Sequence, residues 1–131
     1  MQATRGVIRN RQFASQLRLF EGLKWGTITP TDIDGLIDFS GEAFVFIETK
    51  RAGSSLPLGQ RIALEHLTDL INATGTPCVA LVAVHTSDGD IRVADCEVVE
   101  YRFRGMWNKP PRPMTVWDAV DSFRLRHADE A

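Results

Sequence analysis

The hydrophobic pattern of the chain opens with apolar side chains three or four positions apart, the spacing that places them on one helix face. The residues concerned are Phe13, Leu17 and Phe20. Gly26 follows shortly as a stop signal, so the pattern predicts a first helix over residues 11–23 with one apolar face. Glu21 would lie on that apolar face, which is an unusual place for a carboxylate.

Two runs rich in β-branched and aromatic residues come next, over 31–39 and 43–50, and they predict a β-hairpin. The residues between the runs are Ser40-Gly41-Glu42, which suit a three-residue loop with the glycine or its neighbour in the left-handed region. In that register Phe39 faces Ala43, and every further pair has the same sum of residue numbers.

Helix and strand patterns alternate in the rest of the chain. A second helix is expected to begin after Ser54 and Ser55, either of which could cap it, and to end before Gly75. Residues 79–84 form an almost unbroken apolar run, as in a central strand covered on both faces. The remaining predicted elements are strands over 91–94 and 97–103 and a terminal helix that begins at Thr115.

This order of elements predicts an α/β protein with a mixed β-sheet flanked by helices. The length of 131 residues suits one core, so we expect a single domain over residues 1–131. Cys78 and Cys96 lie far apart without a CxxC spacing, which predicts two buried free thiols. The net charge of −2 argues against coating of nucleic acid by bulk positive charge, so a polyanion would be bound locally.

Neither a membrane nor a secretory route is indicated by the sequence. No run of about 18 apolar residues is present, so no membrane span is expected. Arginines at the N-terminus lead into a polar stretch instead of the apolar region of a signal peptide. We therefore expect an intracellular, cytoplasmic protein.

The predicted hairpin gathers charge on one face of its two strands. Its register places Asp34 opposite Glu48 and Asp32 opposite Lys50, and the alternation of side chains puts all four on one face. Opposed carboxylates about 5 Å apart destabilise a sheet unless a positive group lies between them. Two carboxylates and several waters are a common way to hold Mg²⁺, and Lys50 could then orient a water or stabilise a phosphate.

This arrangement resembles the signature of the PD-(D/E)XK nucleases, in which an acidic residue on one strand precedes a Glu-x-Lys on the next. Here Asp34 is followed, fourteen positions later, by Glu48-Thr49-Lys50. The resemblance spans about residues 13–84 and implies a three-layer, restriction-endonuclease-like αββαβ core, to which the C-terminal strand and helix are added. The family's Pro-Asp is replaced by Thr31-Asp32-Ile33-Asp34, so either aspartate could be the ligand, and the hairpin register favours Asp34.

The resemblance also implies hydrolysis of phosphodiester bonds with Mg²⁺ or Mn²⁺ as cofactor. The implied metal ligands are Asp34, Glu48, Glu21 and Thr49, and the implied catalytic residues are Asp34, Glu48, Lys50 and Gln60. Glu21 resembles the acid that the first helix often adds to the metal shell, and Gln60 resembles a glutamine found beside the active site. The plainer alternatives are a solvated Glu-x-Lys, an edge position for Glu21 and a structural His85.

DNA is the partner that the resemblance implies, cut according to its structure or nonspecifically, because no sequence-reading motif is present. The resemblance extends to Holliday-junction resolvases and to accessory phage and repair nucleases, many of them homodimers. A catalytically idle nuclease fold that serves in nucleic-acid binding or assembly is the alternative. Positive charge for DNA could come from Arg5, Arg9, Arg11, Lys50, Arg51 and, around Trp107, from Arg102, Arg104, Lys109 and Arg112.

Overall fold

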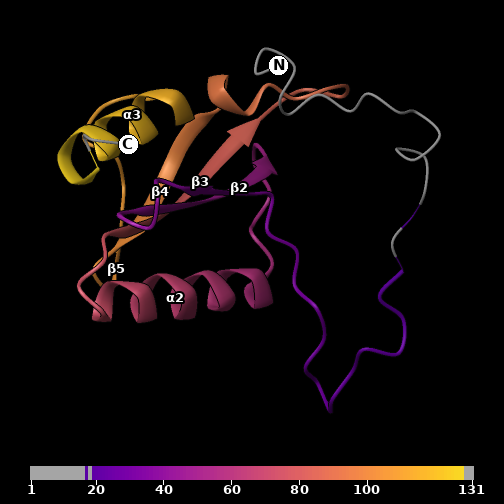
Figure 1. The fold of residues 1–131 in the computed structure, drawn as a ribbon. Coiled ribbons are helices and arrows are strands. Elements are labelled where there is room, and N and C mark those ends of the chain that lie inside the picture. Colours follow the sequence, from indigo (N-terminus) through magenta and orange to yellow (C-terminus); the bar gives the residue numbers. More distant parts are fainter. Residues whose placement is uncertain (1–16, 18, 129–131) are drawn as a thin grey trace, which may run out of the picture. The chain divides into compact units, whose positions relative to one another are not determined.

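The structure is a computed structural model that describes residue 17 and residues 19–128. The chain divides into two compact units, residues 1–30 and 31–131, which are described separately. The second unit contains β1 (Gly35–Asp38), β2 (Phe44–Arg51), α2 (Leu58–Ala73), β3 (Cys78–His85), the 3₁₀ turn η2 (Val93–Asp95), β4 (Glu97–Phe103), β5 (Met106–Asn108) and α3 (Val116–His127) (Figure 1).

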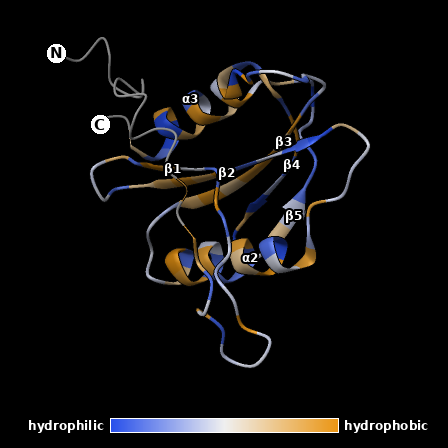
Figure 2. Ribbon diagram, turned by 90° about the vertical axis from the view of Figure 1, so that its right-hand side faces the viewer, coloured by the Kyte–Doolittle hydropathy of each residue, from blue (hydrophilic) through white to orange (hydrophobic). Residues whose placement is uncertain are grey.

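The second unit is a mixed sheet between two helices, as the sequence predicts. Its strand order is β1-β2-β3-β4-β5, with β2 and β3 parallel and every other neighbouring pair antiparallel. The helices α2 and α3 lie on opposite sides of the sheet in both views (Figures 1 and 2). The α/β class is therefore confirmed, whereas the restriction-endonuclease-like core stays a prediction.

Alternation along β2 divides its side chains between two hydrophobic clusters. Val45 and Ile47 belong to the cluster that includes Val116 of α3, whereas Phe46 belongs to the cluster that includes Leu64 of α2. The expectation that one face of the hairpin is charged is therefore wrong in part. The α2 face is apolar at Phe46 and becomes charged only toward the carboxyl end of β2.

The predicted register of the hairpin is confirmed. Gly35 pairs with Ile47 and Asp38 pairs with Phe44, and the Phe39 amide donates to the Ala43 carbonyl at 2.9 Å. Ser40 and Gly41 both adopt left-handed backbone conformations, with φ of 56° and 75°. A three-residue loop thus fixes which side chains meet further along the two strands.

The first strand is shorter than predicted, because β1 begins at Gly35 and residues 31–34 lie outside it. Continued in the same register, the ladder would direct the Thr49 amide to a backbone carbonyl near residue 33. The Thr49 amide instead donates to Oδ2 of Asp34 at 2.8 Å. A side-chain carboxylate thus replaces a backbone acceptor and ends the regular pairing at the position where the site residues meet.

The second helix follows the predicted range but not the predicted cap. Its N-cap residue is Pro57, which has no capping side chain, and the Ser54 hydroxyl donates to the Arg51 carbonyl at 2.6 Å instead. The buried face of α2 carries Leu64 and Thr68. The central apolar strand is confirmed as β3, in which every residue from Cys78 to Ala83 is buried.

The C-terminal part holds one wrong prediction and one missed strand. Residues 93–95 form the turn η2 instead of a strand, and β5 was not anticipated. Arg104 and Gly105 both have positive φ, of 53° and 81°, and form the two-residue turn that joins β4 to β5. Arginine is uncommon in the left-handed region, so the dipeptide Arg104-Gly105 does not predict such a turn.

The predicted start of α3 is confirmed by a reciprocal cap. The Thr115 hydroxyl accepts from the Asp118 amide at 3.1 Å, and the Asp118 carboxylate accepts from the Thr115 amide at 3.2 Å. Thr115→Ala is expected to lower the free energy of unfolding by about 1 kcal/mol, measured by urea denaturation, because helix amides lose this acceptor. Thr86→Ala is the control, since exposed Thr86 lies outside every helix, and an equal loss in both variants would contradict the capping role.

The prediction of a first helix is wrong over the residues of it that the structure describes. Residue 17 and residues 19–23 are not helical, and Glu21 and Gly22 form a turn closed by the Leu23 amide and the Phe20 carbonyl at 3.2 Å. Gly22 has a φ of 86°, which a helix does not allow. Residues 11–16 and 18 lie outside the described part of the chain.

Two further expectations can be compared with the described residues. Cys78 and Cys96 are free and buried, as predicted. Neither helix in this part of the chain has the length and apolar character needed to cross a membrane.

Candidate functional site

The most unusual polar group in the described structure is the carboxyl of Glu48 on β2. Glu48 is only 2% exposed, and its Oε2 atom is buried without a hydrogen-bond partner. A carboxylate removed from water without a partner is costly and must gain a proton or a cation to be stable. This position therefore calls for a proton or a cation on the Glu48 carboxyl.

Asp34 places a second carboxylate beside Glu48. Its Oδ2 atom accepts from both the amide and the hydroxyl of Thr49, each at 2.8 Å. Burial, and after it the nearby charge of Asp34, raise the pKa of Glu48 from 4.5 to about 7. The predicted meeting of Asp34 and Glu48 is thus present, with one carboxylate exposed and hydrogen-bonded and the other buried.

The donor set of this carboxylate pair fits a hard cation with much of its hydration shell retained. Mg²⁺ is commonly held by one or two carboxylates, with waters or phosphate oxygens in its other positions. No group of three or more His, Cys, Asp or Glu residues suited to a metal occurs within residues 17 and 19–128. Two carboxylates therefore fall short of the four protein ligands of a structural zinc ion.

The charge of Asp32 raises the pKa of the Glu48 carboxyl less than the charge of Asp34 does. Asp32 is exposed before the start of β1, and its charge is the smallest contribution to the raised pKa of Glu48. Asp34 is the larger influence and is the one held by Thr49. Of the two aspartates left open by the sequence, the geometry favours Asp34.

Lys50 follows Glu48 by two positions on β2, yet its ammonium group is engaged elsewhere. Its Nζ atom donates to the backbone carbonyl of Ser54, in the loop between β2 and α2. Among the ion pairs of the described residues, none joins Lys50 to Asp34, Asp32 or Glu48. The predicted pairing of Asp32 with Lys50 is therefore absent, because Asp32 lies outside the strand.

Gln60 lies in the first turn of α2 and is half-buried. It precedes Leu64 by one helical turn, and Leu64 packs with Phe46 two positions before Glu48. Because β2 and β3 are parallel, α2 must run back between them, so its first turn lies toward the carboxyl end of β2. Gln60 thus lies at the predicted end of α2 and on the same face of the sheet as Glu48, and its side chain makes no hydrogen bond to the described residues.

The other two implied metal ligands, Thr49 and Glu21, belong to different parts of the chain. Thr49 uses its amide and hydroxyl to hold Asp34, so its observed role is to position that carboxylate. Glu21 belongs to the first unit of the chain, and its place relative to Asp34 and Glu48 is not determined. His85 follows Ala83 by two positions on β3, which puts it on the α3 face, opposite to Glu48.

A charged network between α2 and the strands β4 and β5 was missed by the sequence analysis. Its members are joined by pairs at 2.6–2.9 Å: Arg61 with Glu100, Arg102 with Asp69, and Trp107 Nε1 with Glu65. The guanidinium of Arg61 also lies 4.2 Å from the centre of the Trp107 ring. Alternation along β4 does place Glu100 and Arg102 on one face, which was the available signal.

This network changes the predicted DNA-binding surface. Arg102 and Trp107 both make hydrogen bonds within the fold, and their assignment to DNA contact stays a prediction. Arg104 lies over the Phe103 ring, Arg51 pairs with Asp88, and Lys109 and Arg112 are exposed. Arg5, Arg9 and Arg11 lie outside the described residues.

Comparison of the chain with protein-family models, with curated proteins and with solved structures finds no match.

Proposed function

We propose that this protein is a Mg²⁺- or Mn²⁺-dependent endonuclease that hydrolyses phosphodiester bonds of DNA, structure-specifically or without sequence preference. The observation that supports it most is the buried Oε2 atom of Glu48, left without a partner beside the carboxylate of Asp34. A fold rarely keeps such a group unless the group has a ligand or a chemical role.

The two carboxylates would have different tasks in this proposal. Glu48 provides a ligand whose position is fixed by its burial in the sheet, and Asp34 provides one fixed by two hydrogen bonds from Thr49. A divalent ion held by them would supply positive charge to a phosphate oxygen and lower the pKa of a water. At neutral pH, part of the Glu48 population holds a proton, which the cation would have to displace.

Lys50 and Gln60 would complete the arrangement from the carboxyl end of β2 and the start of α2. Carboxyl ends of parallel strands are the common location of ligand sites in open α/β sheets. Lys50 could stabilise the charge that develops on the phosphate once its ammonium group leaves the Ser54 carbonyl. Gln60 could hold a water or a DNA phosphate through its amide.

The experiment that tests this function measures cleavage of linear duplex, single-stranded and four-way-junction DNA with Mg²⁺, Mn²⁺ or a chelator. Wild-type protein is expected to cut at least one of these substrates with a divalent metal and none with the chelator. Glu48→Gln is expected to lower the rate by about 1,000-fold, equivalent to roughly 4 kcal/mol of transition-state stabilisation. Preference for the four-way junction would indicate a resolvase.

The matched control is Glu42→Gln, which makes the same chemical change at an exposed residue of the hairpin loop. It should leave the cleavage rate unchanged. Cleavage that persists in Glu48→Gln, or that resists the chelator, would rule out the proposed site. Metal-independent DNA binding without any cleavage would instead favour a nuclease fold kept for binding or assembly, a role compatible with the engaged ammonium of Lys50.

A further inference from the structure

A cavity of about 230 Å³ lies between the sheet and α3, on the face opposite to Glu48. Its walls come from β3, β4, the segment before α3 and α3 itself. The apolar and aromatic side chains that line it include Leu81, Val98, Tyr101, Phe103, Met114 and Phe123. A cavity of about 150 Å³ lined by apolar groups can hold benzene, so this space is large enough for a substituted ring.

Aromatic groups form much of one wall of this cavity. The rings of Phe103 and Phe123 meet edge to face with centroids 5.9 Å apart, and His127 lies 4.7 Å from Phe123. Edges and faces arranged in this way offer favourable contacts to another flat ring. The cavity is therefore suited in shape and chemistry to an aromatic guest.

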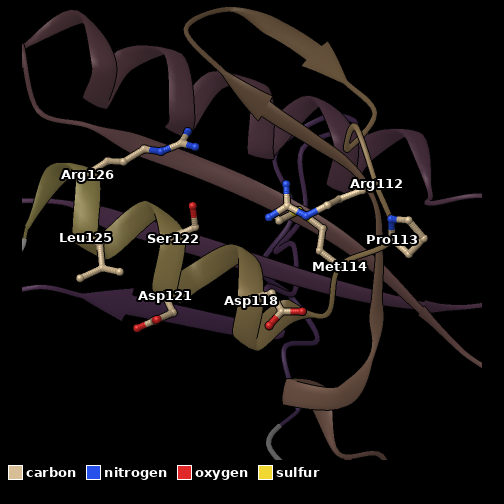
Figure 3. Close-up of a pocket in the computed structure, with 8 residues that line it drawn as sticks. All are labelled: Arg112, Pro113, Met114, Asp118, Asp121, Ser122, Leu125 and Arg126. Carbon is tan, nitrogen blue, oxygen red and sulfur yellow. The ribbon is translucent and has the colours of Figure 1, made fainter.

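Two arginines lie at the mouth of the cavity. Arg112 and Arg126 line both the cavity and the open groove beside it, as does Ser122. In Figure 3 their side chains extend toward each other from opposite sides of the groove, with the Ser122 hydroxyl on the same side of α3. Among the described residues, neither arginine takes part in an ion pair.

The acidic residues of the groove do not neutralise this pair of arginines. Asp118 accepts from the Thr115 amide and caps α3, and Asp121 pairs with Arg124 at 2.8 Å. Both carboxylates line the same groove, but in Figure 3 neither points toward the two guanidinium groups. Two guanidinium forks and a hydroxyl are well suited to a carboxylate or a phosphate.

We propose that this cavity binds a small molecule that combines a flat apolar ring with a carboxylate or phosphate group. The ring would lie between the sheet and α3, and the anionic group would lie between Arg112 and Arg126. The sheet separates this site from Glu48, because Ala83 and Val98 of the cavity face pack toward α3 whereas Phe46 and Leu64 pack toward α2. The inference is therefore independent of the proposed nuclease activity.

Binding can be tested by isothermal titration and amide NMR shifts, with a chelator present so that metal binding has no influence. The probes are phenyl phosphate and benzoate, which show whether the site prefers a phosphate or a carboxylate. Inorganic phosphate tests the anionic group without a ring, and benzyl alcohol tests the ring without an anionic group. One or both ring-bearing anions should bind one to one, at least about tenfold more tightly than either half. Shifts should map to β4 and α3.

Three variants decide which part of the cavity is responsible. Arg126→Gln should weaken binding by about tenfold or more, because a charge-assisted hydrogen bond is lost. Ala119→Leu should do the same by filling the cavity from α3. Arg124→Gln is the matched control on the same helix, since Arg124 pairs with Asp121 and does not line the cavity, and it should bind within about twofold of wild type.

Several results would overturn this inference. These are no binding of either ring-bearing anion, inorganic phosphate that binds as tightly as phenyl phosphate, and equal affinity in Arg126→Gln. Displacement of the probe by short duplex DNA would assign the arginines to a DNA surface and equally overturn the small-molecule site. Ala119→Leu is interpreted only if its amide spectrum shows a folded protein, and Arg126→Gln decides the question otherwise.

Discussion

In metal-free protein, the titration of Glu48 alone is expected to lower the free energy of unfolding by about 3 kcal/mol as pH rises from 4.5 to 7.5. The pKa of this carboxyl is raised from 4.5 to about 7 in the folded protein, so the native state keeps a proton that the unfolded chain releases. The resulting stability is complete below the unfolded pKa and is lost as pH rises through the folded one. Urea denaturation in a chelator, followed across this range, measures it.

Glu48→Gln is the variant that isolates this contribution, because an amide of similar shape has no proton to lose. The stability of the variant relative to that of wild type should therefore rise by about 3 kcal/mol from pH 4.5 to pH 7.5. Glu42→Gln, at an exposed loop position, should follow the wild-type curve. Parallel curves for wild type and Glu48→Gln would show that the carboxyl titrates normally and that its burial has no energetic consequence.

Added Mg²⁺ should reverse the loss in wild-type protein at pH 7.5. A ligand at 100 times its dissociation constant stabilises the state that binds it by about 2.7 kcal/mol. Glu48→Gln should show little of this stabilisation, because a neutral amide replaces the charged ligand. The same carboxyl would then lower stability without metal and raise it with metal, which is the usual trade between stability and function at a site.

Those features that depend on local chain geometry could be predicted from the sequence. The loop Ser40-Gly41-Glu42 fixes the hairpin register, and this register brings Asp34 and Glu48 together. The apolar run of β3 and the Thr115 cap of α3 follow in the same way from residues close in sequence. Each of these predictions needed only turn chemistry, the length of an apolar run or helix capping.

Features that depend on competition between distant groups could not be predicted. The Asp34 carboxylate takes the Thr49 amide and shortens β1, an outcome that strand propensity does not contain. The ammonium of Lys50 finds a backbone carbonyl in the following loop instead of a carboxylate on its own face. Arg102 likewise pairs with Asp69, 33 positions earlier in the chain, and the sequence around Arg102 gives no sign of this partner.

Lys50→Met is expected to lower the rate of metal-dependent DNA cleavage by at least about 100-fold, because a positive group that stabilises developing phosphate charge is lost. Stabilisation of the fold by Mg²⁺ should remain, since the two carboxylates are unchanged. Rates on the preferred DNA substrate and thermal unfolding with and without Mg²⁺ measure the two effects separately. Together they distinguish loss of chemistry from loss of the ion.

The hydrogen bond from Lys50 to the Ser54 carbonyl suggests a competing role, in which the lysine only secures the loop between β2 and α2. Lys50→Arg tests this, because arginine can still donate to that carbonyl but presents its charge in a wider, planar group. If Lys50 acts on the phosphate, Lys50→Arg should stay well below wild type in cleavage while matching it in stability. Full activity in Lys50→Arg, with low stability in Lys50→Met, would assign Lys50 to the loop and remove it from the catalytic group.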